Sequence, residues 1–222
     1  MTTELVEAWF SSGLPGAECP GHATYCRLPL SAVPDIEPPM PRWSWVPSVA
    51  HPLDWAIGGQ AATAGPAFLA AAQAAGLHVP ESLREFIAAP ALANAIRSGT
   101  GCWWSLDARS IGSAPATGQP VIRFLNDQQD VLFWYLLEDG SSEPHVVASY
   151  KDFTFDDPDG PPLPDEMWRC APDFHSFMYR FWLENEIGFR DRAHEPLTPE
   201  QQTYLAQAQR LITFASHDIR AR

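Results

Sequence analysis

The clearest hydrophobic pattern in the chain is that of a helix laid on a core. Bulky apolar residues recur at i, i+3, i+4 and i+7, namely at Phe174, Phe177, Met178 and Phe181. Asp173 is placed to cap the start of this helix, and Gly188 is placed to end it. The pattern therefore predicts one long helix over residues 174–188 with its apolar face on a core.

Strand patterns precede that helix. Residues 121–125 and 131–137 are two apolar runs separated by the polar turn 126–130, which is typical of a β-hairpin. The second run is unbroken, as in a strand at the centre of a sheet. Residues 145–150 predict a third strand after the turn signal at 139–142, and Phe153 with Phe155 can add a short edge. An earlier strand is expected over residues 102–107.

Three further helices are expected. Pro66 suits a first helical position with Gly76 at the end, and Pro80 opens a second helix that stops before Pro90. Residues 92–97 can add one or two turns. Thr198, Pro199 and Gln201 resemble a capping box at the start of a last helix. Helices, then a meander of strands, then helices predict an α+β fold: a central, mostly antiparallel sheet packed by helices.

The N-terminal third has a different character. Residues 11–66 hold ten of the 22 prolines, which excludes long helices and central strands from most of that stretch. Bulky residues among those prolines would be costly to leave in water, so we expect them to pack on the domain: Trp43, Trp45, Val46 and Trp55. We therefore divide the chain into a Pro-rich, irregular wrapping segment over 1–65 and a single α+β domain over 66–222.

Composition supports one globular core. The chain has 222 residues, of which 45% are hydrophobic and 12% aromatic. Residues 1–10 carry no signal-peptide pattern, and the apolar run 131–137 is far shorter than the roughly 20 residues of a membrane span. These features predict a soluble, cytoplasmic protein. Its four cysteines are expected to be reduced thiols.

The charge is strongly acidic. The formal net charge is −13, which disfavours nucleic acid and anionic membrane as partners. Between residues 127 and 191 there are fifteen Asp and Glu but only four basic residues. Such a region favours a basic protein surface or a cationic ligand, and it also serves solubility.

Common catalytic and nucleotide-binding motifs are missing. The chain has no Gly-Lys-Ser/Thr phosphate loop, no Gly-x-Gly-x-x-Gly, no Gly-x-Ser-x-Gly and no His-Glu-x-x-His. We expect no cofactor. Cys170 with His175 is the nearest nucleophile and base pairing in the sequence, which leaves open an enzyme with a Cys/His pair in an aromatic pocket.

Two weaker arrangements remain open. Cys19, His22 and Cys26 have a spacing that can offer three ligands to zinc, although the two-knuckle pattern of structural zinc sites is missing. Asp127 and Asp130 can form a carboxylate pair for acid/base work or a cation site, but acids are also ordinary turn formers.

Large rings and acids fall on neighbouring strands and turns. In the pairs Trp103–Trp104 and Trp134–Tyr135 we expect one ring to face the core and its neighbour to face outward. Outward rings beside acidic turns can grip a basic partner through stacking and ion pairs, unless a helix or the Pro-rich segment covers them. The candidate partner-binding residues are Trp103, Trp104, Asp127, Gln128, Gln129, Asp130, Trp134, Tyr135, Glu138, Asp139, Asp156, Asp157 and Asp159.

Two stretches resemble the SUKH superfamily, which includes the fungal Smi/Knr cell-wall-synthesis regulators and many bacterial immunity proteins. They are Leu77-His-Val-Pro80-Glu-Ser82-Leu-Arg-Glu-Phe86 and Arg123-Phe-Leu-Asn-Asp127-Gln-Gln-Asp130-Val-Leu-Phe-Trp134-Tyr135. The likeness covers about half the chain, residues 77–187, and Ala88-Ala89-Pro90 replaces the aromatic-Asn-Gly element of many members. The resemblance implies an α+β fold without catalytic residues and, in bacterial members, neutralisation of a toxin by direct binding.

The leading hypothesis is therefore a non-enzymatic protein that works by protein–protein interaction, as an immunity protein against a basic toxin or as a regulator. The alternative is a small-molecule enzyme of a biosynthetic pathway. The oligomeric state is left open.

Overall fold

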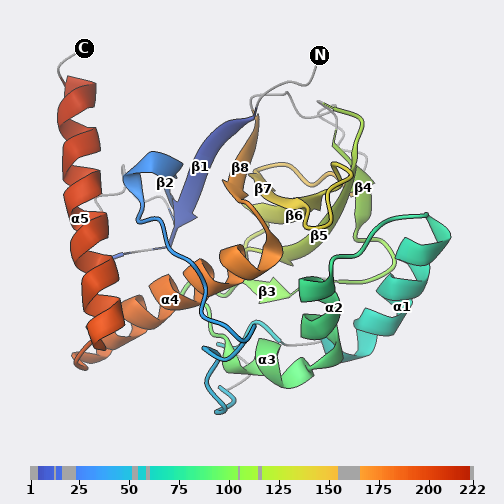
Figure 1. Cartoon of the computed structure of the whole chain (residues 1–222), viewed down its shortest axis with the longest axis horizontal. Helices are drawn as coiled ribbons and strands as arrows, with labels where there is room; N and C mark the ends of the chain where they lie inside the picture. The colour runs from blue at the N-terminus through green and yellow to red at the C-terminus, as the bar shows by residue number, and fades with distance from the viewer. Residues whose placement is uncertain are drawn as a thin grey trace.

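The computed structural model describes residues 5–12, 14–16, 24–51, 55–58, 61–104, 106–114, 117–154 and 166–220. It confirms the α+β class: one eight-stranded mixed sheet is packed by five helices. Figure 1 shows helix α4 crossing below the sheet, helix α5 standing beside β1 and β2, and helices α1 to α3 gathered under the other end of the sheet. In the described ranges, no helix offers an apolar stretch sufficient for a bilayer crossing.

The sheet has the strand order β2-β1-β8-β7-β6-β5-β3, with β4 also paired to β5. Neighbouring strands are antiparallel except β1 and β8, which are parallel. The strands are β1 (Val6–Ser11), β2 (Cys26–Pro29), β3 (Trp103–Trp104), β4 (Ile111–Ser113), β5 (Pro120–Asn126), β6 (Phe133–Leu137), β7 (His145–Ser149) and β8 (Met167–Ala171).

The predicted meander is confirmed. Strands β5, β6 and β7 lie side by side in the order that the turns at 126–130 and 139–142 indicated. Strand β6 is buried along its whole length, as expected for an unbroken apolar run at a sheet centre. The strand predicted over 102–107 is shorter, because only Trp103 and Trp104 pair with β5. Phe153 lies in a turn, and Phe155 is outside the described residues.

The N-terminal third contributes more regular structure than its prolines suggested. Strand β1 lies inside the sheet between β2 and β8, so its residues belong to the same sheet as the later strands. Neither β1 nor β8 was predicted, because their pairing joins segments about 160 residues apart and leaves no local pattern. A 3-10 turn follows β2 at Leu30–Ala32.

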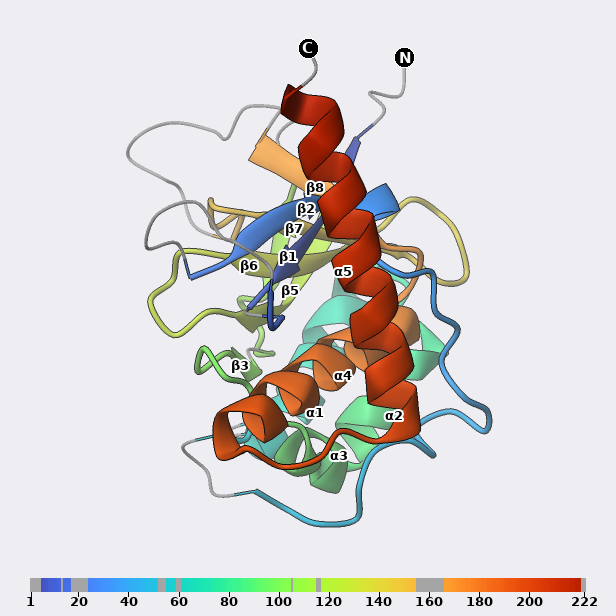
Figure 2. The ribbon, with the colours of Figure 1, turned by 90° about the vertical axis from the view of Figure 1, so that its left-hand side faces the viewer.

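Residues 33–51, which we call the strap, contain no helix or strand. They run along helices α2 and α4 (Figure 2). The ring of Trp43 lies 5.1 Å from Phe86 and 5.9 Å from Phe174. The prediction that Trp43, Trp45 and Val46 pack on the domain is therefore confirmed. Trp55, outside the strap, stays 48% exposed, although its ring meets that of Phe189.

The helices are α1 (Ala61–Ala74), α2 (Glu81–Ala88), α3 (Pro90–Ala95), α4 (Phe174–Ala193) and α5 (Pro199–Arg220). Helix α1 begins before Pro66, which lies inside it, so the prediction of Pro66 as a first position is wrong. Helix α4 begins as predicted, since the Asp173 side chain accepts a hydrogen bond from the amide of Ser176. It continues past Gly188 and ends at His194, which adopts the left-handed conformation.

The start of α5 is the predicted capping box. The Thr198 amide donates to the Gln201 side chain at 3.0 Å, and the Gln201 amide donates to the Thr198 hydroxyl at 3.2 Å. Two of the otherwise unpaired amides at the helix start are thereby satisfied. Glu200 lies in the first turn, where a carboxylate interacts favourably with the positive end of the helix.

Two cores lie on opposite faces of the sheet. The larger one is formed by α1, α2, α3 and α4, and the predicted apolar face of α4 is buried in it at Phe174, Phe177, Met178 and Phe181. The smaller one lies on the other face, where Phe153 stacks on Tyr135 with ring centroids 4.7 Å apart. The sheet is thus covered on both sides.

A third cluster joins α4 to α5 around one buried carboxylate. Glu184 accepts hydrogen bonds from the Tyr204 hydroxyl at 2.6 Å and from the Ser11 hydroxyl at 2.8 Å. Burial raises the pKa of Glu184 above its usual value of 4.5. Strand β1, α4 and α5 are therefore tied together through this one side chain.

We predict that S11A destabilises the fold by about 1–3 kcal/mol, because it removes a hydrogen bond to a buried carboxyl group without replacing it. Urea denaturation followed by circular dichroism measures the change. The neighbouring S12A variant is the matched control, since Ser12 is not fully buried and hydrogen-bonds no described side chain. It should change stability by less than about 0.5 kcal/mol. Equal effects of the two variants would contradict the assigned role of Ser11.

Candidate partner-binding surfaces

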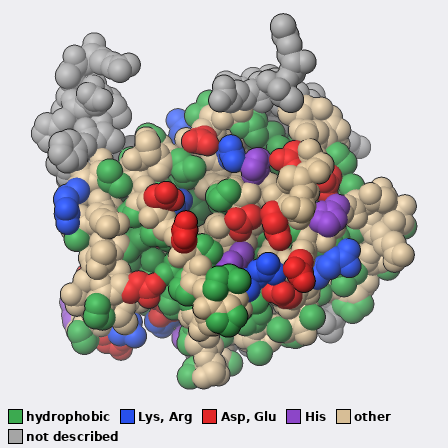
Figure 3. All heavy atoms as spheres, viewed as in Figure 1, with side chains coloured by type: hydrophobic (Ala, Val, Ile, Leu, Met, Phe, Trp, Pro, Cys, Tyr) green, Lys and Arg blue, Asp and Glu red, His purple; other side chains and the backbone are tan. Residues whose placement is uncertain are grey.

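The predicted acidic and aromatic surface does not form one face. The turn carrying Gln128, Gln129 and Asp130 precedes β6, whereas Glu138 and Asp139 follow it, so the two groups lie at opposite ends of that strand. The remaining predicted acids, Asp156, Asp157 and Asp159, lie outside the described residues. On the face drawn in Figure 3, acidic side chains are interspersed with basic and hydrophobic ones.

The prediction of one outward ring in each aromatic pair holds for β3 and is wrong for β6. Trp103 is 41% exposed and Trp104 is buried. Trp134 and Tyr135 are both buried, because β6 is a central strand with each face covered. Trp134 meets Phe177 of α4, and Tyr135 lies under Phe153 on the opposite side.

Asp127 is a buried structural residue, so its prediction as a contact residue is also wrong. It accepts a hydrogen bond from the Tyr25 hydroxyl at 2.7 Å and another from the amide of Gln129 at 2.9 Å. The Tyr25 oxygen also lies 2.9 Å from the Thr100 hydroxyl and 3.2 Å from Cys102 Sγ. Burial raises the pKa of both Tyr25 and Cys102. This network holds the β5–β6 turn in place.

Around the turn, an exposed set of side chains remains, which we call the β5–β6 patch. Its members are Trp103, Gln128, Gln129, Asp130 and Val131. Asp130 has a φ of 54° and accepts a hydrogen bond from the Asn126 side chain at 3.2 Å. Gly101 adopts a φ of 70° and approaches Gln128 so closely that a Cβ there would lie 2.6 Å from its side-chain oxygen. Hydrogen bonds to Asp127 and Asp130 therefore hold the backbone under the patch.

The described hydrogen bonds do not pair the cysteine and the histidine of the enzyme alternative. Cys170 on β8 is fully buried, and burial raises the pKa of its thiol. The Nε2 atom of His175 accepts a hydrogen bond from the Trp45 indole at 3.0 Å instead of facing a thiol. Within the described ranges, neither Cys102 nor Cys170 forms a hydrogen bond with a histidine. Asp127 and Asp130 are likewise committed to the turn.

Of the three candidate zinc ligands, only Cys26 lies within the described residues. Cys26 is disulfide-bonded, so it has no thiolate to offer a metal, and the expectation of reduced thiols is wrong at this position. Cys102 and Cys170 are free. Cys19 and His22 lie outside the described residues. Among the side chains that the structure describes, no group of three His, Cys, Asp or Glu is placed to hold a metal ion.

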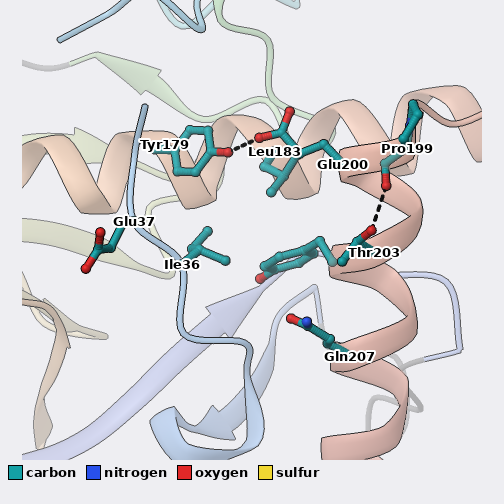
Figure 4. Close-up of a pocket in the computed structure, with 9 residues that line it drawn as sticks. Ile36, Glu37, Tyr179, Leu183, Pro199, Glu200, Thr203 and Gln207 are labelled. Carbon is teal, nitrogen blue, oxygen red and sulfur yellow. Dashed lines mark hydrogen bonds between the residues drawn. The ribbon is translucent and has the colours of Figure 1, made fainter. Parts of the chain in front are cut away.

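One pocket lies between the strap, α4 and α5, and we call it the Tyr204 pocket (Figure 4). Its volume is about 350 Å³, and its opening faces solvent. The strap, α4 and α5 supply its described lining, namely Ile36, Glu37, Tyr179, Leu183, Pro199, Glu200, Thr203, Tyr204 and Gln207. In Figure 4 Tyr179 points toward Glu200, and the Tyr179 hydroxyl donates a hydrogen bond to that carboxylate.

Local sequence patterns point to only part of this pocket. The capping box places Glu200 in the first turn of α5. The helical pattern of α4 places Tyr179 directly after Met178 of the apolar stripe. The strap is far from these helices in the sequence but contacts them in the fold. Pro34 and Arg180 are more than 140 residues apart, and the Arg180 guanidinium donates to the Pro34 carbonyl at 2.7 Å. Such a long-range contact has no periodic signature.

Comparison with known proteins adds no relative. No protein family, no curated protein and no solved structure matches this chain.

The strap is also the basis of a pH-dependent prediction. Burial lowers the pKa of His175 from its usual 6.5, Arg42 acts in the same direction, and Asp173 and Glu85 oppose it. The folded state thus favours the neutral ring, so stability from this group is complete above pH 6.5 and is lost as the pH falls through the lowered pKa.

We predict that wild type loses more unfolding free energy than H175Q when the pH is lowered from about 7.5 to about 5.5. Glutamine does not titrate, and its carbonyl can still accept from Trp45. Urea titrations at both pH values measure the difference. H78Q, changed at an exposed histidine, should follow wild type. An H175Q protein with the full pH dependence of wild type would refute the assignment.

Proposed function

We propose that this chain is a non-enzymatic binding protein that acts by protein–protein interaction through the β5–β6 patch. The observation that supports this most is the 41% exposed ring of Trp103 beside a turn whose conformation is held by buried Asp127. Tryptophan is among the residues most enriched at the energetic centres of interfaces. A large ring left in water on a rigid support suits a contact residue.

Rigidity favours affinity here. Binding costs free energy when side chains and loops must be ordered, and a turn that is already ordered in the free protein avoids part of that cost. The Tyr25–Asp127 hydrogen bond and the hydrogen bond from the Gln129 amide to Asp127 both restrict the turn. Val131, 42% exposed, gives the patch a second exposed apolar side chain.

The chemistry of the patch favours a basic partner. A guanidinium of the partner can stack on the Trp103 ring while Asp130 offers a carboxylate at the rim. The net charge of −13 would speed encounter with a basic protein, and this effect weakens as salt is added. Nucleic acid and anionic membrane are not proposed partners, for the same electrostatic reason.

The resemblance to SUKH proteins makes the proposal more specific. Under that hypothesis the chain is an immunity protein that occludes a basic toxin, or a regulator that binds a protein partner. No residue then has a catalytic role. The proposed compartment is the cytoplasm. The disulfide at Cys26 weighs against that compartment, because disulfides are rare in the reducing cytosol.

We predict that immobilised protein retains a basic protein from a lysate of its source cells at low salt. W103A should weaken binding of that captured protein at least about tenfold, because it removes the central ring. D130N should weaken it less and should reduce its salt dependence, because it removes one rim charge. Asparagine tolerates the left-handed conformation of position 130, so this variant should fold. Biolayer interferometry with the isolated partner measures both.

Two controls match these variants. M40A removes an exposed apolar side chain of the strap, and D191N removes an exposed acid of α4. Both should bind like wild type. If no partner is retained, or if W103A and M40A bind equally well, the proposed role of the β5–β6 patch is wrong.

A further inference from the structure

Two of the nine tryptophans are exposed, and one loop joins them. Trp103 is 41% exposed and Trp55 is 48% exposed, whereas the other seven are buried or half-buried. The Trp55 carbonyl accepts a hydrogen bond from the Ser98 amide at 2.9 Å, and Trp103 directly follows the loop 98–102. The two exposed rings therefore belong to one region of the surface.

The surroundings of Trp55 carry a positive charge. The Trp55 ring meets Phe189 edge-on at 5.3 Å, and the Arg192 guanidinium lies 4.7 Å from the centre of the Phe189 ring. Arg97 also stacks on Phe189, but Glu186 neutralises it at 2.8 Å. Arg192 is exposed, and it forms no ion pair or hydrogen bond with any residue that the structure describes. We call Trp55, Phe189 and Arg192 the Trp55 patch.

The Trp55 patch adjoins the β5–β6 patch across the loop. A Cβ at Gly99 would lie 2.9 Å from Nη2 of Arg192, and a Cβ at Gly101 would lie 2.6 Å from Oε1 of Gln128. Gly99 and Gly101 are two residues apart, so their Cα atoms are separated by at most about 7 Å. The two patches therefore form one continuous surface with an exposed tryptophan in each half.

The two halves of this surface carry opposite charges. Asp130 in the β5–β6 half is exposed, and the one hydrogen bond described for its side chain comes from Asn126 at 3.2 Å. Arg192 in the other half is exposed and has no described acidic partner. A surface with a ring and an acid in one half, and a ring and a base in the other, is complementary to an inverted copy of itself.

We propose that this surface joins two copies of the chain in a two-fold symmetric dimer, in which the Trp55 patch of each copy contacts the β5–β6 patch of the other. In a two-fold interface every contact between different residues occurs twice, so the Arg192 guanidinium of each copy pairs with the Asp130 carboxylate of the other. Tryptophan and arginine are among the residues most enriched at the energetic centres of interfaces.

The distribution of charge favours a second copy as the occupant. A basic protein seated on the β5–β6 patch leaves Arg192 and Trp55 uncovered, whereas a second copy covers both halves. The net charge of −13 on each copy opposes the approach of two copies at low salt, and moderate salt screens this repulsion. The dimer goes beyond the proposed function, and it excludes the basic partner because both use the Trp103 ring.

Sedimentation velocity at about 0.15 M salt tests the dimer. Wild type should sediment as a dimer at high micromolar concentration and dissociate on dilution. R192D and D130K each place like charges against each other across the contact, so each should weaken the dimer at least about tenfold. Lysine suits the left-handed conformation of position 130 less well than aspartate, so circular dichroism checks the fold of that variant. D191N, which removes the acid next to Arg192, is the matched control and should leave the dimer unchanged.

An equimolar mixture of R192D and D130K is the decisive measurement. Each variant alone has the same sign of charge on both halves of its surface, but in a mixed pair both contacts again join opposite charges. The mixture should therefore restore the dimer. Both variants keep a strongly negative net charge, so a general attraction between them does not explain such a result.

Three results would overturn the dimer: wild type that stays monomeric at millimolar concentration, a dimer that neither variant weakens, and a mixture that stays monomeric. The test also separates this proposal from the proposed function. R192D lies outside the β5–β6 patch, so it should lose the dimer and still retain the captured basic protein. A dimer without a captured protein would support the two-fold contact alone, and capture by a monomeric wild type would support the β5–β6 patch alone.

Discussion

Burial of β6 on both faces is the constraint on which the rest of the structure depends. Its five residues, Phe133 to Leu137, are all large and apolar, so no face of the strand can meet water. Helix α4 covers one side through Phe177, and Phe153 covers the other by stacking on Tyr135. The strand must therefore have neighbours on both edges and layers on both faces, and the mixed sheet provides the neighbours.

This constraint decides which aromatic residues remain available for contact. The rings of Trp134, Tyr135 and Trp104 are buried in the core and cannot contact a partner. The strap then covers much of α4 with Trp43 and Trp45, and the His175 ring completes that contact by accepting the Trp45 indole hydrogen. Trp103 escapes because β3 is short and lies at the edge of the sheet. Trp104 has the same side chain and is buried. The exposure of Trp103 therefore follows from its position in the sheet and not from its residue type.

The sequence predicted the parts of the fold that local patterns encode. The turn at 126–130, the apolar stripe of α4 and the capping box at Thr198 each depend on neighbours within a few residues, and each is confirmed. The parallel pairing of β1 with β8 and the contact of the strap with Arg180 join segments more than 140 residues apart. Such contacts leave no periodic pattern of hydrophobic and polar residues in the sequence. For the same reason the sequence suggested the β5–β6 patch in part and the Tyr204 pocket hardly at all.

Acidity in the sequence is also not the same quantity as negative potential at the surface. Asp127 is buried and accepts from Tyr25, Glu184 is buried between two hydroxyls, and Glu186 is paired with Arg97 at 2.8 Å. These groups shape the interior and contribute little to long-range attraction. Asp130 and Glu37 remain in solvent, the first at the β5–β6 patch. Attraction of a basic partner therefore depends on the net charge at low salt, whereas at moderate salt it should respond mainly to the exposed acids close to the contact, because exposed charges beyond about 10 Å are screened.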